Sequence, residues 1–173
     1  MKRYLLLLCI CTSVLANAQN RTAELRQELI DAFDMSEKYS LKICDQMPAE
    51  FYQFRATDSV MTFAEQWRHC VIFSINQIAG RTGVVNPLKE RKLPKVMNKE
   101  QVMSEVKAMY AFIRKTVQEL PEAKLYEKTG FTNGEIPMWR LIYAVENHII
   151  HHRGQVIVYL RLKNIVPEGY VGW

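Results

Sequence analysis

The sequence predicts an all-α protein, a four-helix bundle whose helices are joined by two long connecting loops. Four stretches of roughly 22 to 30 residues repeat apolar side chains at helical spacing. Proline, glycine and helix-capping residues bound these stretches, and no stretch shows a convincing strand pattern or an internal repeat. Because each stretch has one continuous apolar seam, the four seams are expected to pack together in a single core.

The first residues are predicted to be a targeting signal. Lys2 and Arg3 precede an apolar run over residues 5–10, and an Ala-Asn-Ala site ends just before Gln19. This pattern is typical of a secretory signal peptide, here residues 1–18. The apolar run is well short of the ~20 residues that a membrane span needs, so we expect no stable membrane anchor after cleavage. The mature chain is expected to be exported, most simply to a bacterial periplasm.

The remaining chain, residues 19–173, is long enough for a single domain with a substantial core. Loss of the two basic residues of the signal would reduce the net charge of +5 to about +3. This balance does not favour nucleic-acid binding. We interpret the one basic cluster as a solvated loop, and its members are Lys89, Arg91, Lys92 and Lys95. Cys44 and Cys70 either form a disulfide or remain buried thiols, and the sequence leaves both open.

The first helix is predicted over residues 22–46, with Thr22 as its N-cap and Pro48 just beyond its end. Its seam includes two serines among apolar residues and comprises Leu25, Leu29, Phe33, Ser36, Ser40, Ile43 and Met47. Residues 49–57 are predicted to be a connector. Its three aromatic side chains are suited to cover one end of a bundle.

The second helix is predicted over residues 58–79, with Thr57 or Asp58 as its cap and Gly80 at its end. Its apolar stripe comprises Val60, Ala64, Trp67, Val71 and Ile78. His69 lies off this stripe, on a face that mixes polar and apolar residues. Spacing alone therefore favours a surface histidine at this position.

The third helix is predicted over residues 98–120, after a loop at 81–97 that contains glycine and prolines. Asn98 is suited to cap it, Gln101 to complete a capping box, and Pro121 to end it. Its seam comprises Val102, Val106, Met109, Ile113, Val117 and Leu120. We interpret the methionines here as core residues.

The last helix is predicted over residues 136–166, after a second loop at 121–136, and it is bounded by Pro137 and Pro167. Its seam comprises Leu141, Val145, His148, His152, Val156 and Tyr159. Two histidines thus occupy positions where the pattern requires apolar residues.

His148 and His152 are one turn apart along this helix and about 40° apart around its axis, so both rings can point at one atom. This spacing is typical of a helix-borne metal-binding pair. His151 lies about 100° from His152 and leaves the seam. The only other histidine of the chain is His69.

Residues 148–155, His-Ile-Ile-His-His-Arg-Gly-Gln, followed by Tyr159-Leu160-Arg161, closely resemble the C-terminal signature of the DinB family of DinB/YfiT-like helical bundle proteins. Residues 65–69, Glu-Gln-Trp-Arg-His, look like that family's second-helix segment, in which one histidine supplies a metal ligand. The resemblance is specific over 137–167 and looser over about 25–167. It implies the DinB-type bundle with a site at one end, His69 as the third ligand, and a possible homodimer.

Three neutral imidazoles suit zinc, nickel, copper or iron, and we expect one divalent ion, zinc or nickel, with an open position. Such an ion can activate water for hydrolysis, or a thiol for transfer to a small molecule. The resemblance implies both activities: thiol-dependent transferases or isomerases, and metal-dependent hydrolases. Export weakens the transferase hypothesis, because an exported protein meets little low-molecular-weight thiol. Glu65, one turn before His69, is the single candidate general base, and the catalytic residues are otherwise unknown.

Two alternatives remain open: a metal- or ligand-binding bundle without catalysis, and a structural bundle in which the histidines form a polar core cluster. We expect no organic cofactor, because the sequence has no glycine-rich phosphate loop, G-x-S-x-G elbow or CxxC motif. The DinB signature often has an acidic residue where this chain has Ile149. Glu146 is expected to face away from the seam, Arg153 to brace a neighbouring helix, and Gly154 to allow close helix packing.

Overall fold

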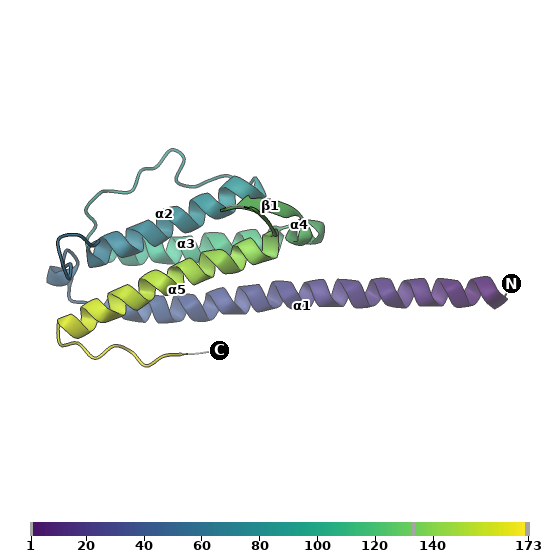
Figure 1. The fold of residues 1–173 in the computed structure, drawn as a ribbon, viewed down its shortest axis with the longest axis horizontal. Helices are drawn as coiled ribbons and strands as arrows, with labels where there is room; N and C mark the ends of the chain where they lie inside the picture. Colours follow the sequence, from purple (N-terminus) through teal and green to yellow (C-terminus); the bar gives the residue numbers. More distant parts are fainter. Residues whose placement is uncertain (1, 133, 172–173) are drawn as a thin grey trace.

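A computed structural model describes residues 2–132 and 134–171, with side chains from Arg21 onward. The described chain is mostly helical, with five α-helices, one short 3-10 helix and a two-stranded hairpin (Figure 1). Its elements are α1 (Lys2–Gln46), η1 (Ala49–Phe51), α2 (Phe63–Thr82), α3 (Lys99–Glu119), α4 (Glu122–Tyr126), β1 (Lys128–Phe131), β2 (Gly134–Pro137) and α5 (Met138–Leu162).

Four of these helices are long and enclose the core. Helix α1 packs against α3 and α5, and α2 packs against the same two helices. Figure 1 shows the four lying side by side, with the N-terminal part of α1 extending beyond the other three. The predicted apolar seams meet between them, and their best-buried members include Leu29, Trp67, Val106, Met109 and Leu141. The prediction of a helical fold is therefore confirmed in its main feature, although the described residues form five α-helices and a short hairpin where four helices were predicted.

Helix α1 begins far earlier than the sequence predicts, at Lys2 instead of Thr22. The predicted signal peptide, residues 1–18, thus has helical backbone from Lys2 onward, whereas Met1 and the side chains before Arg21 lie outside the described residues. Within the described part of the chain, no helix is both long and apolar enough to cross a membrane. Export and signal cleavage stay predictions.

Helix α2 begins at Phe63, five residues later than predicted, because Thr62 and not Asp58 is its N-cap. The hydroxyl of Thr62 accepts the backbone N–H of Glu65, and the carboxylate of Glu65 accepts the backbone N–H of Thr62. At its other end the helix passes Gly80 and stops at Gly83, which adopts φ of 79°. Asn98 and Gln101 form the capping box predicted for α3.

The connection after α3 is not the plain loop that the sequence predicts. It contains α4 and an antiparallel hairpin in which Lys128 pairs with Pro137 and Phe131 with Gly134. Strands of four residues are too short to show a clear alternating pattern, which explains why none was predicted. Leu125 of α4 is fully buried, so this segment closes one end of the core.

Two other segments are held against the helices. Residues 83–98, between α2 and α3, contain no helix or strand among the described residues, and Arg68 of α2 donates hydrogen bonds to the carbonyls of Leu93 and Pro94. The C-terminal tail returns along α1, where the ammonium of Lys42 pairs with Glu168 at 2.6 Å. Cys44 and Cys70 are both free and buried, which settles the choice that the sequence left open.

Candidate metal centre

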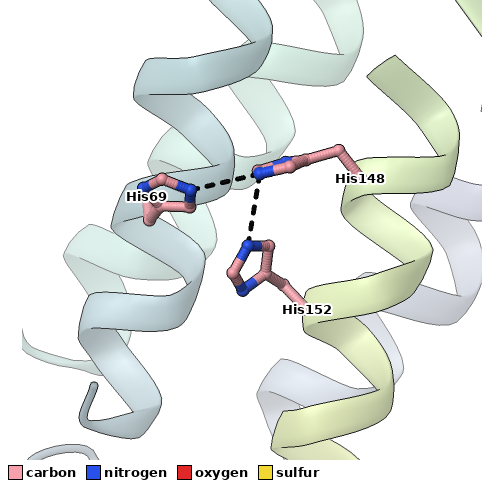
Figure 2. Close-up of side chains that lie close together, drawn as sticks. All are labelled: His69, His148 and His152. Atoms are coloured by element: carbon pink, nitrogen blue, oxygen red, sulfur yellow. Dashed lines mark hydrogen bonds between the residues drawn. The ribbon is translucent and has the colours of Figure 1, made fainter. Parts of the chain in front are cut away.

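Three histidines from two helices converge in the space between α2 and α5. His69 comes from α2, and His148 and His152 come from α5 (Figure 2). The Nε2 atom of His148 lies 3.1 Å from Nε2 of His69 and 3.2 Å from Nε2 of His152. Each ring offers one nitrogen such that all three nitrogens lie within 4.8 Å of one another. The structure therefore brings together the three predicted ligand residues.

The seam of α5 explains how this cluster forms. Its apolar members are buried against the core, and His152, in the same seam, is only 6% exposed. His148 is half-buried one turn earlier, so both rings point towards α2. The mixed polar and apolar face of α2 that carries His69 is turned towards α5. The family resemblance indicated this orientation of His69, whereas the spacing of apolar residues did not. The cluster lies near the middle of α5, not at one end of the bundle as the resemblance implied.

Burial keeps the three imidazoles neutral. Desolvation lowers the pKa of His69, and it lowers the pKa of His148 and of His152 to about 4. For His148 and His152 the neighbouring histidines lower the pKa further, since each ring opposes a positive charge on the others. At neutral pH the nitrogens thus retain the lone pairs that a metal ligand needs.

The orientation of His152 is fixed by a glutamine that the sequence analysis missed. Gln66 is almost fully buried, and its Oε1 accepts a hydrogen bond from Nδ1 of His152 at 2.5 Å. This bond places the proton on Nδ1 and leaves the lone pair of Nε2 directed at the other histidines. The amide nitrogen of Gln66 donates to Gln155 at 2.8 Å, and that of Gln155 donates to His151 at 2.9 Å.

A spacing rule was available to find both glutamines. Gln66 lies three residues before His69, and Gln155 lies three residues after His152, so each shares a helix face with a ligand candidate. His151 is exposed and stands at the end of this hydrogen-bonded chain, outside the cluster. The prediction that it leaves the seam is confirmed.

His148 is positioned by stacking on an aromatic ring as well as by its contacts with the two other histidines. Its ring lies parallel to that of Phe73, with centroids 3.8 Å apart and an angle of 18° between the planes. Phe73 is one turn after His69 on α2, so the same helix face carries a ligand candidate and a support for another. Among the described residues, Nδ1 of His148 is buried and has no hydrogen-bond partner.

Comparison with known proteins identifies the family and supports the fold. The family model described as the DinB superfamily matches residues 32–156. This chain belongs to the DinB superfamily. Among solved structures, a DinB-like protein from Bacillus cereus ATCC 10987 matches with a TM-score of 0.70 and 18% identity, covering 83% of this chain and 96% of its own. A DinB-like protein from Bacillus subtilis matches with a TM-score of 0.65 and 15% identity, covering 84% and 96% respectively. No curated protein matches the chain.

This DinB-superfamily protein has an open cavity of about 530 Å³ beside the cluster, here called the histidine cavity. It is lined by Arg55, Asp58, Ser59, Val60, Met61, Glu65, Arg68, His69 and Ile72. The carboxylate of Glu65, the candidate base, accepts the Thr62 N–H at 2.7 Å and lies 3.9 Å from the guanidinium of Arg55. Glu65 therefore caps α2 as well as lining the cavity, and the cluster is formed without it.

The opposite side of α5 also carries polar groups, and one expectation about it is wrong. Glu146 is buried, and burial raises the pKa of its carboxyl group, while nearby Arg153 opposes the shift. Gly154 does not serve close packing, because a Cβ at this position would meet no atom within 4 Å. Arg153 does brace α1, since its guanidinium donates to the hydroxyls of Ser36 and Ser40. These bonds explain the two serines in the α1 seam.

Proposed function

We propose that this DinB-superfamily protein holds one divalent metal ion through His69, His148 and His152 and acts on a small molecule as a metal-dependent hydrolase or thiol-dependent transferase. The observation that carries the proposal is the convergence of three neutral imidazole nitrogens, two pairs of which are 3.1 and 3.2 Å apart. We further propose that the four long helices act as the DinB-type bundle that holds the two sides of the site together.

The geometry of the three nitrogens fits a metal site. Zinc–nitrogen bonds of 2.0–2.1 Å in a tetrahedral arrangement place ligand nitrogens about 3.4 Å apart, close to the 3.1 and 3.2 Å found for two of the three pairs, and all three nitrogens lie within 4.8 Å of one another. Without an ion, the Nε2 of His148 faces two other Nε2 atoms and can donate only one proton to them. Binding of an ion by Nε2 would require the one proton of the neutral ring to lie on Nδ1, which is buried. The donor set suits zinc or nickel.

The residues of the chain have separable roles in this proposal. Gln66 holds His152 in the tautomer that presents Nε2, and Phe73 fixes the plane of His148. A divalent ion held there supplies Lewis acidity, which lowers the pKa of a water or thiol ligand. The histidine cavity gives a small molecule access to the side of the cluster formed by His69.

Hydrolysis is favoured over thiol transfer by one observation in the sequence. The signal pattern of residues 1–18 supports export, and an exported enzyme meets little low-molecular-weight thiol. A non-catalytic metal-binding bundle requires the same three histidines and differs only in lacking turnover. A homodimer remains a prediction, which light scattering of the purified mature chain would test.

The experiment that tests the proposal measures the metal content of residues 19–173 by mass spectrometry after reconstitution with zinc or nickel. We expect about one equivalent in the wild type and almost none in a His148→Ala/His152→Ala variant. His151→Ala is the matched control, because His151 is an exposed histidine of the same helix that lies outside the cluster, and it should retain the metal. An empty wild type, or equal metal in all three proteins, would refute the metal site.

A further inference from the structure

A second cavity lies beside the histidine cavity, between α2 and the segment at 83–98. This loop cavity has a volume of about 320 Å³, which is in the range of small-molecule sites. It is lined by Arg68, Ile72, Asn76, Leu88, Arg91, Lys92, Leu93 and Lys95. Four of these eight residues are basic, three are apolar, Asn76 is polar and uncharged, and none is acidic.

The apolar part of the loop cavity is continuous with the protein core. Leu93 is buried, and Leu88 and Ile72 are half-buried and pack against core residues. Three hydrogen bonds attach the segment to α2: Arg68 donates to the carbonyls of Pro94 at 2.7 Å and Leu93 at 3.3 Å, and the Asn86 amide donates to Asn76 at 2.7 Å. The walls are therefore held together by the chain itself, and a ligand need not order them.

The charges around this apolar surface are incompletely neutralised. Arg91 forms a bidentate ion pair with Glu105 of α3, which offsets its charge. Among the described side chains neither Lys92 nor Lys95 forms an ion pair, and both are exposed. Arg68 donates to carbonyl oxygens, which leave its positive charge in place. Three of the four members of the basic cluster interpreted from sequence as a solvated loop, Arg91, Lys92 and Lys95, thus line a cavity.

The loop cavity and the histidine cavity adjoin each other. Arg68 and Ile72 line both cavities. Along α2, Arg68 directly precedes His69 and Ile72 follows it by three residues. A molecule whose body occupies the loop cavity therefore extends past Ile72 towards His69. Acidic residues, Asp58 and Glu65, line only the histidine cavity, so a negative group is favoured at the opposite end, among the lysines.

We propose that the loop cavity binds a small amphipathic oxyanion, with an apolar body against Ile72, Leu88 and Leu93 and a carboxylate or phosphate held by Lys92 and Lys95. A cavity of this size holds an apolar body of about ten to fifteen non-hydrogen atoms. This inference names the class of substrate for the proposed function, and its assignment as substrate rests on that function. Binding itself does not, because no residue that lines the loop cavity is a metal ligand.

The test uses three probes with the same body: 4-phenylbutyrate, 4-phenylbutyl phosphate and the neutral 4-phenylbutan-1-ol. Each is titrated by calorimetry into metal-free wild-type protein and into the His148→Ala/His152→Ala variant. Lys92→Gln/Lys95→Gln removes the proposed anion contacts. Lys89→Gln/Lys107→Gln is the matched control, because it removes two exposed lysines that lie outside the loop cavity.

We expect at least one anionic probe to bind about tenfold more tightly than the alcohol, in wild type and histidine variant alike, and the tighter of the two names the anion. Lys92→Gln/Lys95→Gln should abolish this preference and leave alcohol binding unchanged, whereas the control variant should retain it. Equal binding of all three probes, no saturable binding, or the same loss in the control would overturn the proposal. If the anionic probes bind but the reconstituted protein contains no metal, the loop cavity stands as an anion-binding site and only the metal-dependent function is refuted.

Discussion

Replacing Gln66 with leucine tests whether the site is organised for metal binding or merely polar. Gln66 is 1% exposed, and its Oε1 is the acceptor for Nδ1 of His152 at 2.5 Å. Leucine keeps a similar volume but leaves this N–H without an acceptor, so the ring loses its preferred tautomer and orientation. Loss of such an acceptor typically weakens metal binding 10- to 100-fold, or about 1.4 to 2.7 kcal/mol.

The assay for Gln66→Leu is competition for zinc against a chromophoric chelator at pH 7.5, after circular dichroism shows that the variant is folded. Gln66→Glu retains an acceptor for Nδ1 and is expected to bind zinc at least as tightly as the wild type. Gln155→Leu removes a contact one step further from His152 and should weaken binding only a few-fold. Wild-type affinity in folded Gln66→Leu, or an equal loss in Gln155→Leu, would refute the orienting role.

Three further predictions concern the cluster and its supports. Phe73→Leu removes the ring stacked on His148 and should lower zinc affinity several-fold in the chelator assay. Phe73→Tyr keeps an aromatic ring and should bind zinc as tightly as the wild type. Equal zinc affinities of the two variants would contradict a positioning role for the stacked ring. Burial lowers the pKa of His148 and of His152 to about 4, whereas the pKa of an ordinary histidine is about 6.5. Between these two pH values the unfolded chain binds more protons than the folded metal-free protein. The unfolding free energy of the metal-free protein should therefore fall as pH drops from about 7 to 4. Urea unfolding at several pH values measures this dependence of stability on pH. The dependence should be weaker in His148→Ala/His152→Ala, and an unchanged dependence in that variant would show that the two histidines do not cause it. Leu141→Ala, at a fully buried position, should cost about 2 to 5 kcal/mol of unfolding free energy, and Leu162→Ala, at an exposed end of the same helix, less than about 0.5 kcal/mol; equal costs would contradict the burial of the α5 seam.

The sequence predicted the long helices because their cores are built from helical repeats of apolar residues, which are local information. Its errors lie where a distant contact decides. The start of α2 is one exception, because its Thr62–Glu65 capping box is a local pattern that was overlooked; only the bond from the Phe63 N–H to the Phe54 carbonyl comes from further along the chain. The short strands β1 and β2 exist through their mutual pairing and through contact with α5.

The candidate site shows the same division. His148 and His152 were found from spacing, because one helix places them together. His69 needed the family resemblance, since the relation between α2 and α5 is tertiary. Gln66 was missed because its spacing from His69 shows a shared helix face, but not that its side chain contacts a histidine of another helix. Glu146 was expected only to face away from the seam, and its burial shows that the apolar seam is not the only buried face of α5.

The chain of hydrogen bonds from His152 through Gln66 and Gln155 ends at a ring that water can reach, that of His151. A change in the buried imidazole alters the polarity of each amide in turn, so the outermost ring experiences it without touching the cluster. The 15N chemical shifts of the His151 ring, recorded in protein labelled only at histidine, would then show whether a metal ion is bound at the buried histidine cluster.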